Sequence, residues 1–199
     1  MRVAIIGGGD SRLDCPFDDP GIIIWAINNC YQGLPRVDAV LEIHPIFGEG
    51  AQWWRRGEKE FRGMAVEKYL QELNSLGVPV YLQKRIPIIR NSISYPLKEI
   101  IEKFQTKYFS SSVSLAIALA LYQEAKEIQL YGINMAANEY QKQRPSCEYW
   151  IGRAEGMGVK VAISKTSSLL FGPIYGFDET TPSLMLARRD LALSQIKRG

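Results

Sequence analysis

The chain has 199 residues, 46% of them hydrophobic, and its 24 basic and 21 acidic residues leave a net charge of +3. This length and apolar content suit one main folded domain, and charges so mild and interspersed do not require a nucleic-acid partner. Three cysteines without Cys-x-x-Cys spacing fit reduced thiols rather than a disulfide framework or a zinc site. The chain opens directly into a predicted strand, and its longest apolar stretch, residues 113–122, is too short to span a bilayer. We therefore expect a cytoplasmic protein without a membrane span.

The first predicted strand ends in a glycine-rich turn. Residues 3–6, Val-Ala-Ile-Ile, are typical of a buried strand of a parallel sheet, and they stop at Gly7, Gly8 and Gly9. Glycine lets the backbone approach a ligand closely, so we predict a phosphate-binding turn that includes Ser11, the alternative being a plain tight turn. Arg12 replaces the third glycine of the dinucleotide fingerprint, and the next strand ends in asparagines instead of an acid, which argues against an NAD enzyme. The P-loop pattern is absent from the sequence.

The rest of the chain alternates between strands and helices. Further strands are predicted at residues 21–27, 38–43, 78–82, 127–131 and 159–164, and loops at residues 10–20 and 84–95. Helices are predicted at residues 64–76, 96–104 and 115–122 and from Pro145 onward. Residues 52–61 mix tryptophans with basic residues, and they are interpreted either as a packed helix or as an aromatic-basic binding surface. The alternation predicts an α/β fold with a mostly parallel sheet and helices on both of its faces.

Ligands of such sheets bind beyond the carboxyl ends of the strands, where small and polar residues of several segments converge. Serines before the apolar helix cap it and present hydroxyl and N–H groups to an anion. We predict a nucleotide or phosphate site formed by Gly7, Gly8, Gly9, Ser11, Asn28, Asn29, Ser110, Ser111, Ser112, Asn134 and Met135.

Glu42 and His44 end the third predicted strand, and alternation places them on the same face. A neutral imidazole is a suitable general base at pH 7, with Glu42 orienting it. The two residues are thus the predicted catalytic pair, with a shared ligand or metal and a hydrogen-bonded strand-end histidine as the alternatives. Tyr140 and Arg144 follow the fifth of the chain's main strands, and they are candidates for holding a second substrate or a phosphate.

Residues 1–170 are predicted to form the nucleotide-binding domain, and residues 171–199 a helical tail. The tail's helix begins at Thr181 and Pro182, which suit the N-cap and the first helical position. Its leucines need cover, from the domain or from a second subunit, so we expect a homo-oligomer formed through this helix.

Several short motifs within residues 1–165 resemble those of a known superfamily. They are Ile-Ile-Gly-Gly-Gly-Asp-Ser, Ile-Asn-Asn, Tyr-Phe-Ser-Ser-Ser, Lys-Glu-Ile-Gln-Leu-Tyr-Gly-Ile-Asn-Met and a downstream Glu-Tyr. The pattern resembles the Rossmann-like superfamily that includes the CMP-sialic-acid-dependent bacterial sialyltransferases of the lipooligosaccharide type. The same superfamily includes the archaeal 6-hydroxymethyl-7,8-dihydropterin pyrophosphokinases and short proteins carried by phages.

The resemblance implies a Rossmann-like fold and a nucleotide-dependent transferase, with glycosyl or diphosphate transfer as its reaction. Gly7, Gly9 and Ser11 match the sialyltransferase turn, and Asn28 matches the asparagine that contacts the cytidine nucleotide. A pyrophosphokinase reaction requires Mg²⁺ bound with the nucleotide, and Asp10 is the best candidate ligand, with a helix cap or a turn as its alternative role. Two departures favour the alternative of a non-catalytic nucleotide- or partner-binding protein: Asn134 replaces the family's acid, and the chain has no histidine after His44 where the sialyltransferases have their general base.

Overall fold

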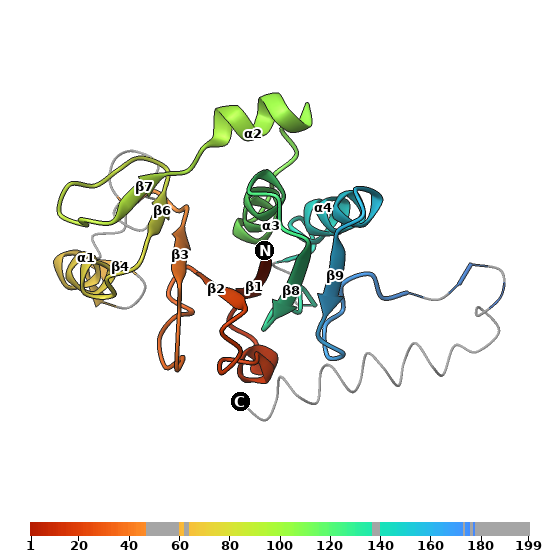
Figure 1. Ribbon diagram of the computed structural model, residues 1–199, viewed down its shortest axis with the longest axis horizontal. Helices are drawn as coiled ribbons and strands as arrows, with labels where there is room; N and C mark the ends of the chain where they lie inside the picture. Colours follow the sequence, from red (N-terminus) through yellow and green to blue (C-terminus); the bar gives the residue numbers. More distant parts are fainter. Residues whose placement is uncertain (47–59, 62–63, 137–139, 173, 176, 178–199) are drawn as a thin grey trace.

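The computed structural model describes residues 1–46, 60–61, 64–136, 140–172, 174–175 and 177. Its main sheet has seven strands, all parallel, in the order β7-β6-β3-β2-β1-β8-β9 (Figure 1). The strands are β1 (Arg2–Ile6), β2 (Ile22–Ile27), β3 (Ala39–Glu42), β6 (Val80–Leu82), β7 (Ser92–Ser94), β8 (Glu127–Tyr131) and β9 (Lys160–Ile163). The predicted α/β fold with a parallel sheet is therefore confirmed.

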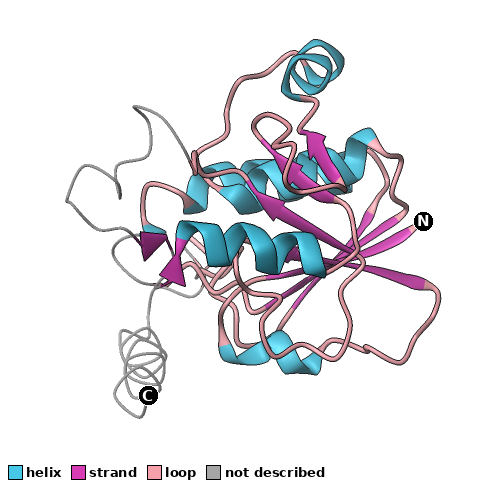
Figure 2. Ribbon diagram, turned by 90° about the vertical axis from the view of Figure 1, so that its left-hand side faces the viewer, coloured by secondary structure: helices cyan, strands magenta, loops and turns pink. Residues whose placement is uncertain are grey.

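Helices pack on both faces of this sheet, as predicted (Figure 2). One face carries α3 (Ser112–Tyr122) and α4 (Arg144–Gly156), with α2 (Leu97–Phe104) packed on α3. The opposite face carries α1 (Val66–Ser75) over β3 and β6, and the short 3-10 helix η1 (Asp10–Asp14) near β8.

Alternation along each central strand separates the two layers of core. In β1, Val3 and Ile5 join the core under α3, whereas Ala4 and Ile6 point to the other face. Every residue of β1 after Arg2 is buried, which is why the sequence shows a continuous apolar run there instead of alternation. α3 is apolar around most of its circumference because it lies between the sheet and its neighbours α2 and α4. With 11 residues it is too short to cross a bilayer, and no described helix is both long and apolar enough to do so.

Two local predictions were wrong, and a third is refined. The predicted loop at residues 84–95 contains the edge strand β7, whose Ser-Ile-Ser sequence has no apolar run because an edge strand is only half covered. The predicted loop at residues 10–20 holds no long helix, but it begins with the short 3-10 helix η1. The helix predicted from residue 64 begins at Val66, because residues 64–65 pair antiparallel as β5 (Met64–Ala65) with β4 (Glu60–Phe61).

Two predictions fall mostly or wholly outside the described residues: the aromatic-basic segment at residues 52–61 and the helix of the C-terminal tail.

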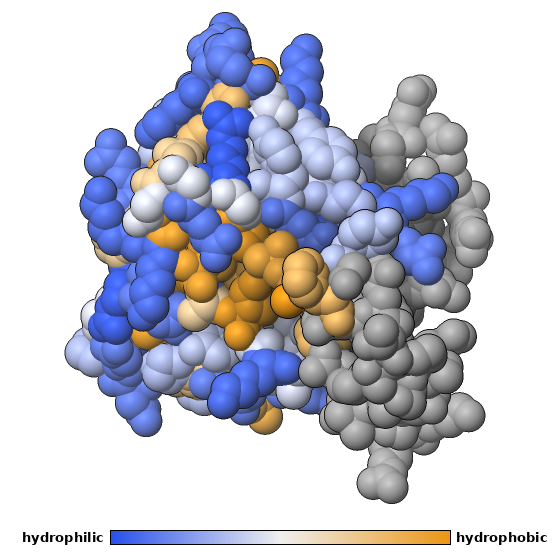
Figure 3. Space-filling model, turned by 90° about the vertical axis from the view of Figure 1, so that its right-hand side faces the viewer, coloured by the Kyte–Doolittle hydropathy of each residue, from blue (hydrophilic) through white to orange (hydrophobic). Residues whose placement is uncertain are grey.

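The second edge strand of the main sheet, β9, is only partly buried. Its residues Val161 and Ile163 pack against the core from the edge of the sheet. Figure 3 shows hydrophobic side chains gathered in the middle of the molecular face on this side.

The sheet has one point at which the strand order reverses. β1 pairs with β2 on one side, and on the other side it pairs with β8, which comes more than 100 residues later in the chain. The loops after β1 and β8 therefore begin next to each other at the edge of the sheet. One leads to η1 on one face of the sheet, and the other leads to α4 on the opposite face. In doubly wound sheets this arrangement opens a crevice where ligands bind.

Candidate functional site

A cavity of about 660 Å³ opens at this reversal point, beyond the carboxyl ends of β1, β2, β3 and β8 and beside the N-terminus of α3. It brings together twelve of the residues predicted for the site, from six separate segments of the chain. They are Gly7, Gly8, Gly9, Asn28, Asn29, His44, Ser110, Ser111, Ser112, Asn134, Met135 and Tyr140. The structure places Ser11, Glu42, Asp10 and Arg144 outside the cavity lining. Their functional roles stay predictions.

The glycine turn after β1 is in close contact with the end of β8. The N–H of Gly7 donates to the carbonyl oxygen of Tyr131, and that of Gly9 to the carbonyl oxygen of Gly132, both at 2.8 Å. A Cβ on Gly7 would lie 2.6 Å from the Gly132 oxygen, so only glycine allows this approach. The hydroxyl of Ser11 accepts a hydrogen bond from the Gly132 N–H at 2.9 Å, which gives Ser11 a structural role. Of the three glycines, only Gly8 has an N–H without an acceptor among the described residues.

The N-terminus of α3 supplies further donors to the cavity. Ser111 is the N-cap: its hydroxyl accepts from the Ser114 N–H at 3.1 Å, and the Ser114 hydroxyl accepts from the Ser111 N–H at 3.3 Å. Ser110 and Ser111 also contact α4, with the Ser110 hydroxyl 2.6 Å from that of Ser146. Their hydroxyls are therefore engaged by the protein.

In the described part of the chain, the N–H groups of Ser112 and Val113 have no acceptor. Both residues line the cavity in the first turn of α3. The first N–H groups of a helix point outward at the positive end of its dipole, and they favour an anion. The serine-rich helix start thus offers its backbone, more than its hydroxyls, to a ligand.

Asn134 is held by the segment that follows β9. Its side-chain oxygen accepts from the Ser168 N–H at 3.0 Å, and the Ser168 hydroxyl donates to its carbonyl oxygen. Because this bond uses the oxygen, the amide orientation is defined and the NH₂ group is left as the donor at the cavity. An aspartate here would present a carboxylate instead, so asparagine makes this position a donor.

His44 and Glu42 lie together, as the alternation predicted. The Nδ1 atom of His44 is 3.0 Å from Oε1 of Glu42 and 3.2 Å from Oδ1 of Asn28. Glu42 is fully buried, whereas the side chain of His44 is 38% exposed. On its other side, Glu42 accepts a hydrogen bond of 2.6 Å from the hydroxyl of Tyr69 on α1. An imidazole whose orientation is set by a buried carboxylate, at the edge of a polar cavity, is suited to accept a proton from a bound hydroxyl group.

Arg144 and Asp10 are placed away from this centre. The Arg144 Nε atom lies 2.8 Å from Oε1 of Glu148, and its guanidinium also donates to the Phe171 carbonyl oxygen at 3.2 Å. It therefore ties α4 to the chain after β9. Asp10 is exposed at the first residue of η1.

The described residues of the cavity lining do not by themselves form a magnesium site. They supply amides, hydroxyls, backbone groups and one imidazole, but no carboxylate and no basic side chain. Mg²⁺ prefers carboxylate oxygens. No group of three His, Cys, Asp or Glu residues that could hold a metal occurs in the described parts of the chain.

Sequence reasoning missed several residues of the site. In the sequence, Tyr69 is one residue of the helix predicted at residues 64–76, and no local pattern links Ser168 to Asn134. The lining also includes Gly132, Val113, Ile27, Ile133, Cys30, Ala136 and Gln143. Some of these seven residues could have been predicted from the sequence, because they directly precede or follow predicted residues at the same strand ends.

No family model matches the chain, and no curated protein matches it. Solved structures of the sialyltransferase CstII from Campylobacter jejuni do match. One, in complex with a trisaccharide acceptor and CMP, has a TM-score of 0.53 and 16% sequence identity, and the match covers 85% of this chain and 83% of that one. Another, with cytidine-5'-monophosphate as a substrate analogue, has a TM-score of 0.51 and 17% identity, covering 85% of this chain and 81% of that one. The resemblance to the sialyltransferases is therefore confirmed as a similarity of fold over most of the chain.

Proposed function

We propose that this protein is a nucleotide-dependent transferase that takes a sugar from a nucleotide-sugar donor. One observation carries the proposal: two N–H groups that have no acceptor among the described residues, those of Ser112 and Val113, face a cavity at the strand-order reversal that also holds His44. The fold similarity to a sialyltransferase that binds CMP supports the same conclusion.

The nucleotide phosphate would lie at the N-terminus of α3. There the Ser112 and Val113 N–H groups, the Gly8 N–H and the amide NH₂ of Asn134 all offer hydrogen atoms to anionic oxygens. Asn28 and Asn29 would contact the nucleoside from the end of β2. These donors are neutral, so the binding energy would come from directed hydrogen bonds and the helix dipole.

His44 would accept the proton of the acceptor hydroxyl group. In this step the acceptor oxygen forms a bond to the anomeric carbon of the sugar, the bond from that carbon to the phosphate oxygen breaks, and the nucleotide leaves with the electron pair. The proton moves to Nε2 of His44, while Glu42 stays bonded to Nδ1. Glycosyl transfer is favoured over diphosphate transfer because the described lining offers no carboxylates for the Mg²⁺ that the latter requires.

Nucleotide binding is tested by calorimetric titration with CMP, CDP, UDP, UDP-glucose, ATP and a pterin, each with and without Mg²⁺. A matched pair of variants then locates the phosphate. Ser112→Pro removes one N–H at the first helical position, where proline fits and where the extended Ser111 tolerates it. Ser112→Ala keeps the N–H and removes only the hydroxyl.

We expect Ser112→Pro to weaken nucleotide binding about 10- to 100-fold, since a hydrogen bond to a charged group contributes about 1.5–3 kcal/mol. Ser112→Ala should bind within a few-fold of the unmodified protein. Equal affinities for the two variants would place the phosphate elsewhere, and no binding of any nucleotide would overturn the proposal.

A measurement of turnover distinguishes the transferase from a protein that only binds nucleotides. The alternative of a binding protein is favoured by two sequence features: Asn134 stands where the sialyltransferases have an acid, and the chain has no histidine after His44. With the nucleotide sugar of the best-binding base, donor hydrolysis or transfer is followed by release of the free nucleotide. His44→Ala should abolish turnover and leave nucleotide affinity nearly unchanged. Binding without turnover in the unmodified protein would support the binding protein instead.

A further inference from the structure

We propose that Tyr69 is a positioning residue that acts through Glu42 to determine which ring nitrogen of His44 carries the proton. This inference rests on the proposed function, in which His44 accepts a proton at the cavity. It adds an α1 residue, outside the cavity lining, to the apparatus of the site.

The contacts form a chain from α1 through β3 to the cavity. Tyr69 and Glu42 are both fully buried, and the phenol oxygen of Tyr69 is 2.6 Å from Oε2 of Glu42. The other oxygen, Oε1, accepts from the backbone N–H of His44 at 3.2 Å and lies 3.0 Å from its Nδ1. The two carboxylate oxygens are thus divided, one toward α1 and one toward the imidazole.

This division defines the tautomer. An ionised carboxylate only accepts hydrogen bonds, and the side-chain oxygen of Asn28 beside the same nitrogen is also an acceptor. Nδ1 of the neutral imidazole must then carry the hydrogen, which leaves the lone pair on Nε2. A free neutral histidine prefers the opposite tautomer, so the arrangement prepares the ring for proton acceptance at Nε2.

The hydroxyl of Tyr69 has a role that packing alone does not require. α1 is buried against the sheet by Val66, Leu70 and Leu73, and a phenylalanine at position 69 would fill the same space. A buried hydroxyl is costly unless it is bonded, and here it is bonded to Glu42. Without this bond the carboxylate loses the contact that directs Oε2 toward α1, and Oε1 is held less firmly against Nδ1.

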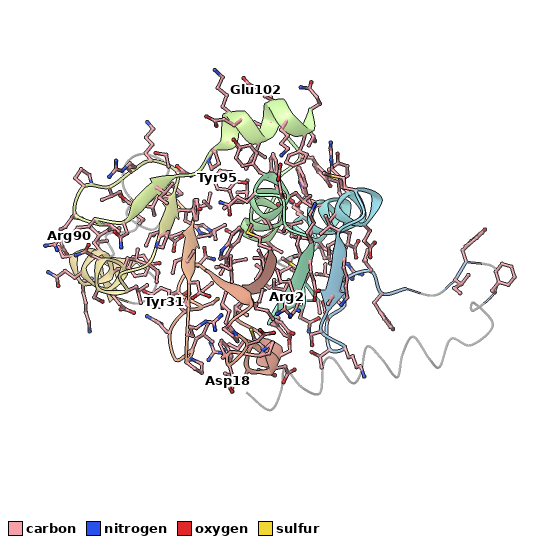
Figure 4. The ribbon with its side chains drawn as sticks, in the orientation of Figure 1. Arg2, Asp18, Tyr31, Arg90, Tyr95 and Glu102 are labelled. Atoms are coloured by element: carbon pink, nitrogen blue, oxygen red, sulfur yellow. The ribbon has the colours of Figure 1, made fainter. Side chains whose placement is uncertain are left out.

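The sequence makes this testable without any assignment work, because His44 is the only histidine of the chain. Long-range ¹H–¹⁵N correlation spectra of the full chain at about pH 8, where an ordinary imidazole is neutral, report which ring nitrogen is protonated. Tyr69→Phe is compared with Tyr95→Phe, which also deletes a buried tyrosine hydroxyl. Tyr95 lies in the other core layer and donates to the Leu115 carbonyl oxygen at 2.9 Å (Figure 4).

The unmodified protein and Tyr95→Phe should show His44 protonated at Nδ1. Tyr69→Phe should shift the population toward protonation at Nε2. A wild-type spectrum with the proton on Nε2, or a Tyr69→Phe spectrum identical to the wild type, would overturn the inference.

A second variant covers the case in which Tyr69→Phe does not fold. Glu42→Met removes the carboxylate acceptor from Nδ1 at nearly the same side-chain volume, and it should shift the proton toward Nε2; an unchanged tautomer would again overturn the inference. These spectra are recorded without nucleotide. A protein that binds no nucleotide would thus refute the proposed function and leave this result intact, whereas a Tyr69→Phe spectrum identical to the wild type would refute the Tyr69 role alone.

Discussion

At the scale of single residues, the buried Glu42 is the most consequential side chain of the site. A carboxylate removed from water is tolerated only where donors surround it, and Glu42 has the Tyr69 hydroxyl on one oxygen and, on the other, the backbone N–H of His44 with its ring Nδ1 3.0 Å away. The same contacts that orient His44 therefore also stabilise the fold.

Glu42→Gln should lower the free energy of unfolding by about 1–3 kcal/mol, because the amide NH₂ group faces donors that it cannot accept from. Urea denaturation followed by circular dichroism measures the change. The matched control is Glu102→Gln on α2, whose side chain is 64% exposed (Figure 4); it should change stability by no more than about 0.5 kcal/mol. Equal effects of the two substitutions would contradict the burial argument.

Asp19, at the opposite end of the sheet from the cavity, should make the stability of the protein depend on pH. The Gly21 N–H bond, and after it the Arg2 guanidinium, hold the pKa of Asp19 below its usual value of 3.8. A carboxyl with a lowered folded-state pKa contributes stability above its unfolded-state pKa and loses it as the pH falls through the folded-state value.

Asp19→Asn should therefore be less stable than the unmodified protein at pH 7, and the difference should shrink below about pH 4. Urea denaturation at pH 7, 5 and 3 measures it. Asp18→Asn serves as the control, because the exposed Asp18 makes no hydrogen bond or ion pair with the described residues. A difference that stays constant with pH would show that the charge of Asp19 contributes nothing.

At the scale of elements, the ends of β1 and β8 are joined by a close backbone contact. Gly132 has a φ of +64°, and a Cβ added there would lie 2.5 Å from the carbonyl oxygen of Gly7. Gly77, after α1, has a nearly identical φ of +69° but has nothing within 4 Å of an added Cβ. The two glycines thus separate backbone strain from crowding.

Gly77→Ala should cost about 1–2 kcal/mol, the penalty of the left-handed conformation alone. Gly132→Ala should cost clearly more, because the turn after β1 must also move, and it should weaken nucleotide binding as well. Urea denaturation compares the two. Similar losses of stability for Gly77→Ala and Gly132→Ala would mean that the turn after β1 shifts at little cost, and that the backbone contact between the ends of β1 and β8 is not rigid.

At the scale of the whole molecule, each of the three cysteines lies in a different environment. Cys15 lies in the core on the η1 side, Cys147 in the core beneath α4, and Cys30 at the cavity. Burial raises the pKa of Cys15 to about 11, against an opposing effect of Arg36, and it raises the pKa of Cys147 as well. Thiolates are the reactive form, so both buried thiols should be nearly inert in the folded protein.

Alkylation with iodoacetamide at about pH 8, read by peptide mass spectrometry, should modify Cys30 first and leave Cys15 and Cys147 unmodified until urea unfolds the protein. A nucleotide bound in the cavity should slow the reaction at Cys30 and leave the other two unchanged. Modification of Cys15 or Cys147 in the folded protein would contradict the burial argument, and no protection of Cys30 by a bound nucleotide would place the nucleotide away from it.

Much of the fold was predictable because its signals are local. Six of the seven strands of the main sheet lie at segments that were predicted as strands from their apolar residues. β7 was missed because a short edge strand with two serines needs no apolar run. In the site, the twelve predicted residues that line the cavity were predictable because parallel strands end at one edge, but the partners of Ser110 and Ser111 on α4 were not.

The sequence by itself determined that the sheet is parallel, where its strands end, and that polar residues of several segments gather there, because strand patterns and turns depend on neighbouring residues. Only the tertiary structure decided which of these groups can serve a ligand. The N–H groups of Gly7 and Gly9 are used by the end of β8, Ser11 bonds to Gly132 from 121 residues away, and Tyr69 reaches Glu42 from α1. The reason is that a hydrogen-bonding group is available to a ligand only if folding brings it no protein partner, and those partners come from distant parts of the chain.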